Sequence, residues 1–528
     1  MRSMDSSGFG FDVARSVTAV FLQQSFIYGV SLLTFGVFAR FLSVDQMGLY
    51  AFLYVALYFL AYAGNIGLKK IMIRLTSSHK ALGEQELMRR AFWTSSTIGL
   101  IPILAFSFIV IHLMNYLRYF DVSNPDIDPL LFLIAMIIFS SRYHLSGGME
   151  GLKRFERLSI YGAGSFTLRR VIAMFLVTMG GGVTGILIAW LVGEGLCLAL
   201  VLREVVKDYS RPLLGYDLKT LFNQSGPMFI ADLSSVLVEW GDRAVVAIFG
   251  LGWLAFFHVA ASGNTFLSTA TMAVYVGVLP YLSEAYHSDG GRGLVMRVKE
   301  LGRYVVLFSA PLAIGGAALA YPLIDLIVGP TYMDAAPIFM LMAIGVWLST
   351  PSTLIQSALI AAGLTREVMY ATVAGTLLEI TVFVGLAGVY GLVSAGLGRA
   401  LLLVSTFILC LFFMHRKMGL EMDWSAVWKA YLSSFIMGVV AYYLWEFIRK
   451  GVWFVLAYSV LLPLLLVISL IVYVVCLRLL RVARVDEVAM LYRSLPSRFR
   501  VVVRLISLIM GLDYGLVREE AMRVAEEE

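Results

Sequence analysis

Three ionisable side chains lie along one face of an apolar segment in the middle of the chain, GPMFIADLSSVLVEWGDRAVVAIFG, residues 226–250. On a helix, at about 100° per residue, Asp232, Glu239 and Arg243 fall within roughly 40° of one another. Glu239 and Arg243 also have the spacing of a helical ion pair, and Asp242 lies to one side. Ionisable groups are costly inside a membrane and usually face a partner or a hydrated cavity. Three ionisable groups on one helix face favour the wall of a hydrated cavity over a structural ion pair between helices.

Three other apolar segments carry polar side chains along one helical face. The groups are Gln24, Tyr28 and Ser31; Tyr54, Tyr58, Tyr62 and Asn65; and His258, Ser262, Thr265 and Thr269. We call Tyr54, Tyr58 and Tyr62 the tyrosine ladder. Tyrosines often form a belt at the membrane surface, and core packing is another ordinary reason for such a face. A ladder that crosses the membrane also suits the mixed apolar and polar surface of sugars, so both interpretations stay open.

Single charges inside other apolar segments point less clearly to a function. They are Arg169, Arg170, Glu194, Glu379 and Arg399. Each could pair with a neighbouring helix or face a transport path, and long arginine side chains can also reach toward the membrane surface. The sequence does not choose between these roles.

Fourteen apolar stretches, each about long enough to cross a bilayer as a helix, position these residues. We expect spans at 16–39, 48–67, 91–114, 130–147, 160–179, 183–202, 227–249, 253–282, 303–327, 337–362, 367–388, 393–414, 427–447 and 453–477. The composition agrees, since 60% of residues are hydrophobic and only 14% are charged, well below a soluble domain. The sequence predicts an all-α, polytopic membrane protein.

Lysine and arginine gather in alternate loops, after the second, fourth, sixth and eighth spans. Such residues are retained on the cytoplasmic side, so we expect both termini to be cytoplasmic, with the protein in the cell membrane. This loop pattern also explains the net charge of +6, and we do not expect nucleic acid as a partner.

The order of loop lengths in spans one to six repeats in spans seven to twelve. Because six is even, the two halves enter the membrane in the same sense, and transporters place the substrate path between such repeats. Similar loops in any long polytopic chain are the alternative explanation. We expect an N-terminal lobe at 1–220, a C-terminal lobe at 221–420, two further helices at 421–480 and a cytoplasmic amphipathic tail at 481–528.

Motifs of soluble enzymes are missing from the sequence. We find no Walker phosphate loop, no HExxH and no nucleophile elbow. The three cysteines lie inside apolar stretches, which favours core packing over disulfides or a metal site. We therefore expect no enzyme activity and no cofactor, and transport driven by an ion gradient, the membrane potential or the gradient of the substrate.

Several stretches resemble the polysaccharide-export flippases of the MOP exporter superfamily, which move lipid-linked oligosaccharides. FARFLSVDQMGLYAFL followed by NIGLKKIMIR is similar to their first two helices. GDRAVVAIFGLGWLAFFHVA and VLPYLSEAY resemble the seventh and eighth, and SALIAAGLTREVMY with YGLVSAGLGRALLL the stretch from helix ten to twelve. The resemblance covers most of residues 10–415, and the order and spacing of these degenerate motifs carry it.

The resemblance implies a MATE-like fold of two six-helix lobes, with a V-shaped cavity lined by helices one, two, seven and eight. The polar stripes lie on those same helices. Cationic cavity residues would hold the phosphate or pyrophosphate linkage of the cargo, and the matching positions are Arg243, Arg40 and Arg74. Glu379 departs from the neutral polar residue expected in helix eleven, which puts the role of that helix in doubt.

Our hypothesis is a flippase for a polyprenyl-linked oligosaccharide, working by alternating access beside the glycosyltransferases or polymerase of its pathway. The tyrosine ladder and the other polar stripes would face the sugars. Glu239, Asp232, Asp242 and Glu379 would balance charge or couple transport to Na⁺ or H⁺. One alternative is a cation-coupled exporter of drugs or metabolites from the same superfamily. A lipid-modifying membrane enzyme is the other, but the loops lack the acidic or histidine cluster it would need.

Overall fold

The computed structural model describes residues 27, 29–119, 128–420, 422–450, 457–480, 482, 504, 507 and 513–527. All regular secondary structure in these ranges is helical, which confirms the all-α expectation. Ten of the described helices are long and apolar enough to cross a membrane. An eleventh span results if α11 (Ala335–Leu348) and α12 (Ser352–Ala361), which meet at an angle of 50°, are counted together. The protein is therefore a multi-pass membrane protein.

The first, seventh and eighth predicted spans are not among these ten. Only Gly29–Phe41 of the first is described as a shorter apolar helix. The seventh is α8 (Leu218–Ala247), which is long enough but carries the three ionisable residues of its polar stripe together with Asp242. The eighth begins α9 (Leu251–Ala318), which consists of two helices that meet at a kink at Gly290 (φ 65°, ψ −154°), within the basic loop expected at 283–302. The fold nevertheless follows the predicted order of spans.

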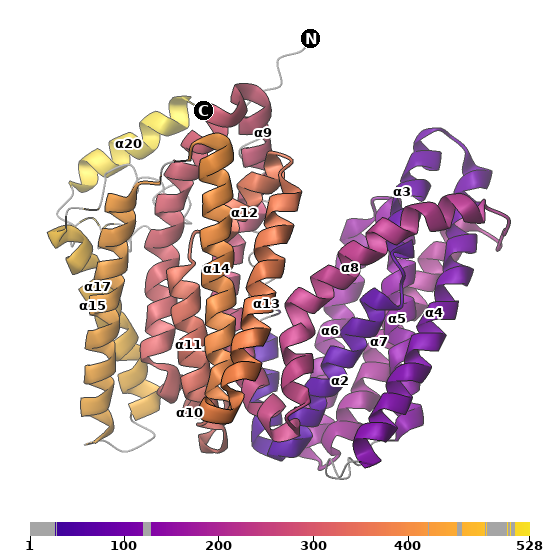
Figure 1. Ribbon diagram of the computed structural model, residues 1–528, viewed down its shortest axis with the longest axis horizontal. Coiled ribbons are helices and arrows are strands. Elements are labelled where there is room, and N and C mark those ends of the chain that lie inside the picture. The colour runs from indigo at the N-terminus through magenta and orange to yellow at the C-terminus, as the bar shows by residue number, and fades with distance from the viewer. Residues whose placement is uncertain are drawn as a thin grey trace. The chain divides into compact units, whose positions relative to one another are not determined.

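The chain forms two compact units, which we describe separately. The N-terminal unit comprises Phe26–Val259 and Ile327–Tyr332. Its helices, from indigo to magenta in Figure 1, are α2 (Val44–Ala63), α3 (Leu68–Ala81), α4 (Gln85–Tyr119), α5 (Pro129–Gly151), α6 (Phe155–Thr178), α7 (Gly182–Tyr209), α8 and the first turns of α9, with the short η1 (Pro330–Tyr332). Helix α8 packs on α2 and α3 within this unit. The lobe boundaries given above stay a prediction.

The C-terminal unit comprises Ala260–Leu326 and the chain from Met333 onward. It holds the rest of α9, then α10 (Ala320–Val328), α11, α12, α13 (Thr365–Tyr390), α14 (Val393–Met418), α15 (Trp424–Arg449), η2 (Ala457–Leu461), α17 (Leu462–Leu479) and α20 (Tyr514–Glu527). Helices α13 and α14 pack along each other, as do α15 and α17. Within the amphipathic tail expected at 481–528, the segment SRFRVVVRLISLIMGL (497–512) lies almost wholly outside the described residues, and α20 carries most of the acidic end that follows it.

Helix α2 ends in a sharp break that the sequence did not predict. Ile66 and Gly67 both have positive φ, 47° and 70°, and α3 starts at the next residue. A left-handed backbone is costly for a β-branched residue such as isoleucine. At Gly67, a Cβ would stand 2.6 Å from backbone atoms of Ser225 and Phe229 in α8, so only glycine fits. After the break, the segment that was expected to be a loop forms helix α3 instead, and its first turn contains two lysines.

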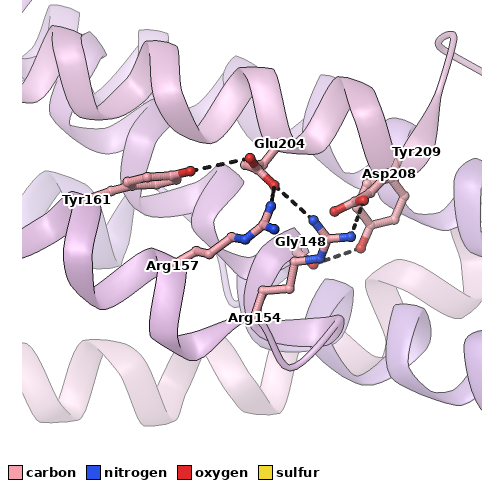
Figure 2. A network of polar contacts seen from close by, with 7 residues as sticks. All are labelled: Gly148, Arg154, Arg157, Tyr161, Glu204, Asp208 and Tyr209. Carbon is pink, nitrogen blue, oxygen red and sulfur yellow. Dashed lines mark hydrogen bonds and ion pairs between the residues drawn. The ribbon is translucent and has the colours of Figure 1, made fainter.

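A network of charges ties together the ends of α5, α6 and α7 (Figure 2). It consists of Gly148, Arg154, Arg157, Tyr161, Glu204, Asp208 and Tyr209. Glu204 accepts hydrogen bonds from Arg154 at 2.9 Å and from Arg157 at 2.5 Å. Arg154 also reaches Asp208 at 2.5 Å. These arginines belong to the basic loop expected after the fourth span, so they hold helix ends together besides contributing positive charge.

A close backbone contact joins α2 to the start of α9, at Gly48. A Cβ on Gly48 would stand 2.0 Å from the carbonyl oxygen of Leu251, so we expect Gly48→Ala to cost roughly 1–3 kcal/mol by overpacking. The matched control is Gly385→Ala in α13, where no atom lies within 4 Å of the added carbon. That change should be neutral or slightly stabilising, because glycine is a poor helix former. Thermal unfolding of the detergent-solubilised protein measures both; equal melting temperatures would contradict this packing.

Candidate functional site

In the N-terminal unit, Tyr54 and Tyr58 of the tyrosine ladder lie against tryptophans of α7 and α8, and Tyr62 lies against Tyr143 of α5. Tyr58 stacks on Trp240, with ring centroids 4.9 Å apart. Tyr54 lies 5.4 Å from Trp240 and 6.0 Å from Trp190. The three ladder tyrosines are half-buried, so their rings are held by packing while part of each surface stays accessible. The sequence indicated the ladder but not its two tryptophan partners.

Tyr50 and His258 extend this aromatic surface by one helical turn. Tyr50 is buried in α2, and its ring lies 5.8 Å from the imidazole of His258. His258 belongs to α9 and lies 6.4 Å from Tyr54. The structure thus joins two of the predicted stripes within one unit, by way of a tyrosine that the sequence analysis did not single out.

Arg243 is buried in α8 beside this surface. Its guanidinium carbon lies 4.6 Å from the ring centre of Trp240. One guanidinium nitrogen donates to the backbone carbonyl of Glu239 at 3.0 Å and lies 3.4 Å from the carboxylate of Asp242. Asp242, which the helical spacing set to one side, is therefore a neighbour of Arg243, because its carboxylate folds back along α8. Glu239 is exposed.

Two lysines follow the break between α2 and α3, and each pairs with a carboxylate of another helix. Lys70 lies 2.5 Å from Asp232 of α8, and Lys69 lies 2.8 Å from Glu150 of α5. The ammonium of Lys69 also stands 3.9 Å from the ring centre of Tyr143. Asp232, expected on the wall of a cavity, is thus the buried partner of a surface lysine.

Asn65 stabilises the break itself. Its side-chain oxygen accepts from the backbone nitrogen of Lys69 at 3.2 Å and lies 2.5 Å from Nδ1 of His144. Its amide nitrogen donates to the carbonyl of Ala61 at 3.3 Å. All these partners belong to the protein, so a substrate-binding role for Asn65 stays a prediction.

Two arginines pair with one carboxylate where α5, α6 and α7 meet. Glu194 of α7 accepts from Arg169 of α6 at 2.6 Å and also forms an ion pair with Arg142 of α5. Arg170, next in sequence, donates to the hydroxyl of Tyr50 at 3.3 Å. Both Arg169 and Arg170 also lie against the ring of Phe166. The arginine cluster, which we define as Arg142, Arg169 and Arg170, therefore adjoins the aromatic surface through Tyr50.

Arg170 differs from the other buried cations of this unit. It is 8% exposed, and no carboxylate of the described residues forms an ion pair with it. Its Nε–H also has no hydrogen-bond partner in that part of the chain. A buried guanidinium without a counter-charge is costly unless something else supplies one. The sequence indicated Arg170 only as one of several single charges, because the lack of a paired carboxylate within the described residues is a property of the fold.

The comparisons with known proteins agree with this architecture. Residues 37–337 match the family described as polysaccharide biosynthesis protein. The chain belongs to this family. It is 23% identical over 351 residues to the succinoglycan biosynthesis transport protein ExoT of Rhizobium meliloti (strain 1021), which covers 64% of this chain and 67% of ExoT.

Two solved structures share the fold of this family member. The lipid II flippase MurJ, in its inward closed conformation, matches with a TM-score of 0.66 and 15% identity over 87% of this chain and 98% of MurJ. An inward-facing multidrug resistance MATE transporter of the MOP superfamily gives a TM-score of 0.61 with 14% identity, over 74% and 94% of the two chains. The MATE-like fold expected from the sequence is confirmed.

For the remaining predicted site residues, the structure shows no contact with this surface or does not describe the side chain. Arg40 and Arg74 are exposed, and their role as phosphate ligands stays a prediction. Ser262 and Thr265 continue the stripe of His258 along α9, but they belong to the C-terminal unit. Gln24 and Tyr28 lie outside the described residues, as does the side chain of Thr269.

Glu379 and Arg399, two of the single buried charges, face each other in the C-terminal unit. Glu379 of α13 is buried, and its carboxylate lies 3.6 Å from the guanidinium of Arg399 of α14. The structure therefore favours a helix-to-helix contact for this pair. Within the described residues no three His, Cys, Asp or Glu side chains come together as metal ligands would.

In the Lys70–Asp232 ion pair, we expect substitution of one partner to cost more stability than substitution of the other. The side chain of Lys70 is 46% exposed and that of Asp232 only 6%. Lys70→Met would leave a buried carboxylate without its cation, at a cost of roughly 1–3 kcal/mol. Asp232→Asn leaves an ammonium that can reach water, so it should cost less. We expect a larger fall in melting temperature for Lys70→Met than for Asp232→Asn, with partial recovery in the double variant. Equal falls, or an additive double variant, would contradict the pairing.

Proposed function

We propose that this protein is a flippase that moves a polyprenyl-linked oligosaccharide from the cytoplasmic to the outer leaflet by alternating access. Its family description, polysaccharide biosynthesis protein, supports this cargo class. ExoT, MurJ and the MATE protein are transporters or flippases by their descriptions, and they share either sequence or fold with this chain. Surface polysaccharide or glycoprotein synthesis would be the pathway, with its glycosyltransferases or polymerase as partners.

Arg170 is the observation that carries the proposal. A buried arginine inside a membrane protein usually pairs with an acid or serves a substrate path. The acids near Arg170 are engaged elsewhere, since Glu194 pairs with Arg169 and Arg142. A phosphate or pyrophosphate linkage would supply the missing counter-charge, because a guanidinium binds phosphate oxygens in bidentate fashion. Arg243 lies against Trp240, whose ring contacts that of Tyr54, and would be a second ligand.

The aromatic surface beside Arg170 suits the saccharide part of such a cargo. Sugar rings combine apolar C–H faces with a rim of hydroxyl groups. Tyrosine offers both an apolar ring and a hydrogen-bonding hydroxyl, and the hydroxyls of Tyr54 and Tyr58 lie 3.3 Å apart on one helix face. The tyrosine ladder could therefore guide sugars while the arginines hold the charged linker.

Alternating access requires two end states whose populations the cargo or a driving ion can shift. We propose Na⁺, H⁺ or the membrane potential as the driving force, with both termini in the cytoplasm. Asp232, Asp242 and Glu379 lie beside Lys70, Arg243 and Arg399, so charge balance within the protein is the role that their positions support. Glu239, which is exposed on α8, is the better candidate for ion coupling.

Substitution of Arg170 tests the proposal in a host strain that lacks the chromosomal gene. Loss of a charge-assisted contact worth ~1.5–3 kcal/mol should reduce surface polysaccharide roughly 10- to 100-fold for Arg170→Gln. Arg170→Lys keeps the charge but not the bidentate geometry and should fall between Gln and wild type. Arg366→Gln, at an exposed position of α13, is the control for the loss of one arginine.

The measurement is surface polysaccharide per unit of membrane-inserted protein, together with the lipid-linked precursor that accumulates inside the cell. Undiminished polysaccharide in both Arg170→Gln and Arg243→Ala would show that these arginines do not hold the linker. A general folding defect would instead lower the amount of inserted protein for the variants, which the normalisation detects.

A cation-coupled exporter of drugs or metabolites is the alternative, and the exposed carboxylate of Glu239 on α8 is what favours it. This function predicts efflux of cationic compounds. Glu239→Gln should reduce that efflux, and Arg170→Gln should leave it unchanged. The flippase predicts the opposite sensitivity at Arg170, so the same two variants separate the two functions.

A further inference from the structure

A cavity of about 660 Å³ lies in the C-terminal unit, whereas the arginine cluster belongs to the N-terminal unit. It is formed by α10, the C-terminal end of α15 and η2, with Met333 at its edge. Its volume falls within the range of roughly 300–1,000 Å³ of pockets that hold drug-sized ligands. A ligand as large as a di- or trisaccharide would fit, and nothing in the functions discussed so far uses this cavity.

Aromatic side chains form much of the cavity wall. Trp445 is buried, and its ring lies 5.2 Å from that of Tyr458 at an angle of 60°, which makes a corner of two flat surfaces. Tyr321 and Tyr442 line the same cavity and are 45% exposed. Such rings can pack on the C–H faces of sugars.

The charged groups of the cavity balance one another. They are Asp325, Glu446, Arg449 and Lys450. Glu446 and Arg449 form an ion pair at 2.8 Å, and Asp325 accepts a hydrogen bond from the hydroxyl of Tyr458 at 2.5 Å. A phosphate group entering here would meet two carboxylates, whereas a neutral polyhydroxylated ligand could hydrogen-bond with both signs of charge. The lining therefore favours sugar hydroxyls over an anion.

The predicted topology places this cavity on the outer side of the membrane. With both termini cytoplasmic, the ninth and thirteenth spans run outward, so the C-terminal ends of α10 and α15 would lie at the outer surface. A saccharide that has crossed the membrane would emerge on that side. A cavity there could hold sugars after translocation and so oppose their return.

We propose that this cavity is an exit subsite that binds neutral glycosyl residues of the delivered saccharide. The proposal rests on the proposed flippase function, and it adds a second sugar-binding place in the other unit. Binding at the exit would stabilise the outward-delivered state, which is one way to favour net outward transport.

Two neighbouring tyrosines supply a matched pair of variants. Tyr442 lines the cavity, whereas Tyr443, the next residue on α15, is 68% exposed and does not. The probe is the oligosaccharide mixture released by mild acid from the surface polysaccharide of the host. Saturation-transfer NMR on the full-length protein in nanodiscs measures contact with sugar protons. We expect Tyr442→Ala to reduce the signal at least fivefold and Tyr443→Ala to leave it unchanged.

A second variant, Asp325→Asn, keeps the proposal testable if Tyr442→Ala folds poorly. It preserves the side-chain shape and removes only the charge, and we expect at least a threefold loss of signal. Equal signals for wild type, Tyr442→Ala and Asp325→Asn would overturn the proposal. So would a signal that depends on Tyr442 with glycerophosphoethanolamine but not with the oligosaccharides, since the cavity would then be a lipid headgroup site.

The failure of this inference can be told apart from failure of the flippase function. If Arg170→Gln abolishes surface polysaccharide while the cavity variants bind sugar like wild type, the exit subsite is wrong and the flippase stands. If Arg170→Gln leaves polysaccharide intact but sugar binding still depends on Tyr442, the cavity binds saccharides and the transport role fails.

Discussion

The cost of burying charge in an apolar interior governs the N-terminal unit. An isolated ion is strongly unfavourable in a low dielectric, so each buried charge needs a partner with good geometry. Glu194 meets this need with Arg142 and Arg169, and Asp232 with Lys70. Each of these contacts joins different helices, so the pairing of charge also fixes which helices lie next to one another. The long-range order of the unit depends on these contacts as well as on apolar packing.

The break between α2 and α3 is a consequence of the same constraint. A continuous helix would place Lys69 on the face of the tyrosine ladder and Lys70 about 100° further round the helix. The left-handed turn at Ile66 and Gly67 changes this placement and directs the lysines toward Glu150 and Asp232. Asn65 and the close approach of α8 hold the turn in place. The two ion pairs therefore compensate for the backbone strain at Ile66.

The sequence was sufficient for properties that depend on local patterns. Apolar length predicted the helices, and four-residue spacing predicted the tyrosine ladder, since both follow from the geometry of a helix. Contacts between residues far apart in the sequence could not be predicted. Arg142 and Glu194 are 52 positions apart, and no spacing rule connects them. The break at Ile66 was missed because a β-branched residue argues against a left-handed turn. Asp242 was set aside because helical angles locate Cα atoms, whereas its carboxylate reaches Arg243 by folding along the helix.

The charge of the arginine cluster bears on which cargo the N-terminal unit can accept. Arg142, Arg169 and Arg170 carry three positive charges and Glu194 carries one negative charge, which leaves an excess of two positive charges among these four residues. The neighbouring rings of Tyr50, Tyr54 and Trp190 bring no charge to offset it. In a low dielectric this excess repels cations over several ångströms and attracts anions. A cationic drug would have to overcome that field, whereas an anionic linker with neutral sugars would neutralise it and place its sugars on the aromatic surface. The same charge arrangement that is costly for the empty protein thus becomes favourable with the cargo bound, and this difference is what allows a ligand to shift the balance between end states.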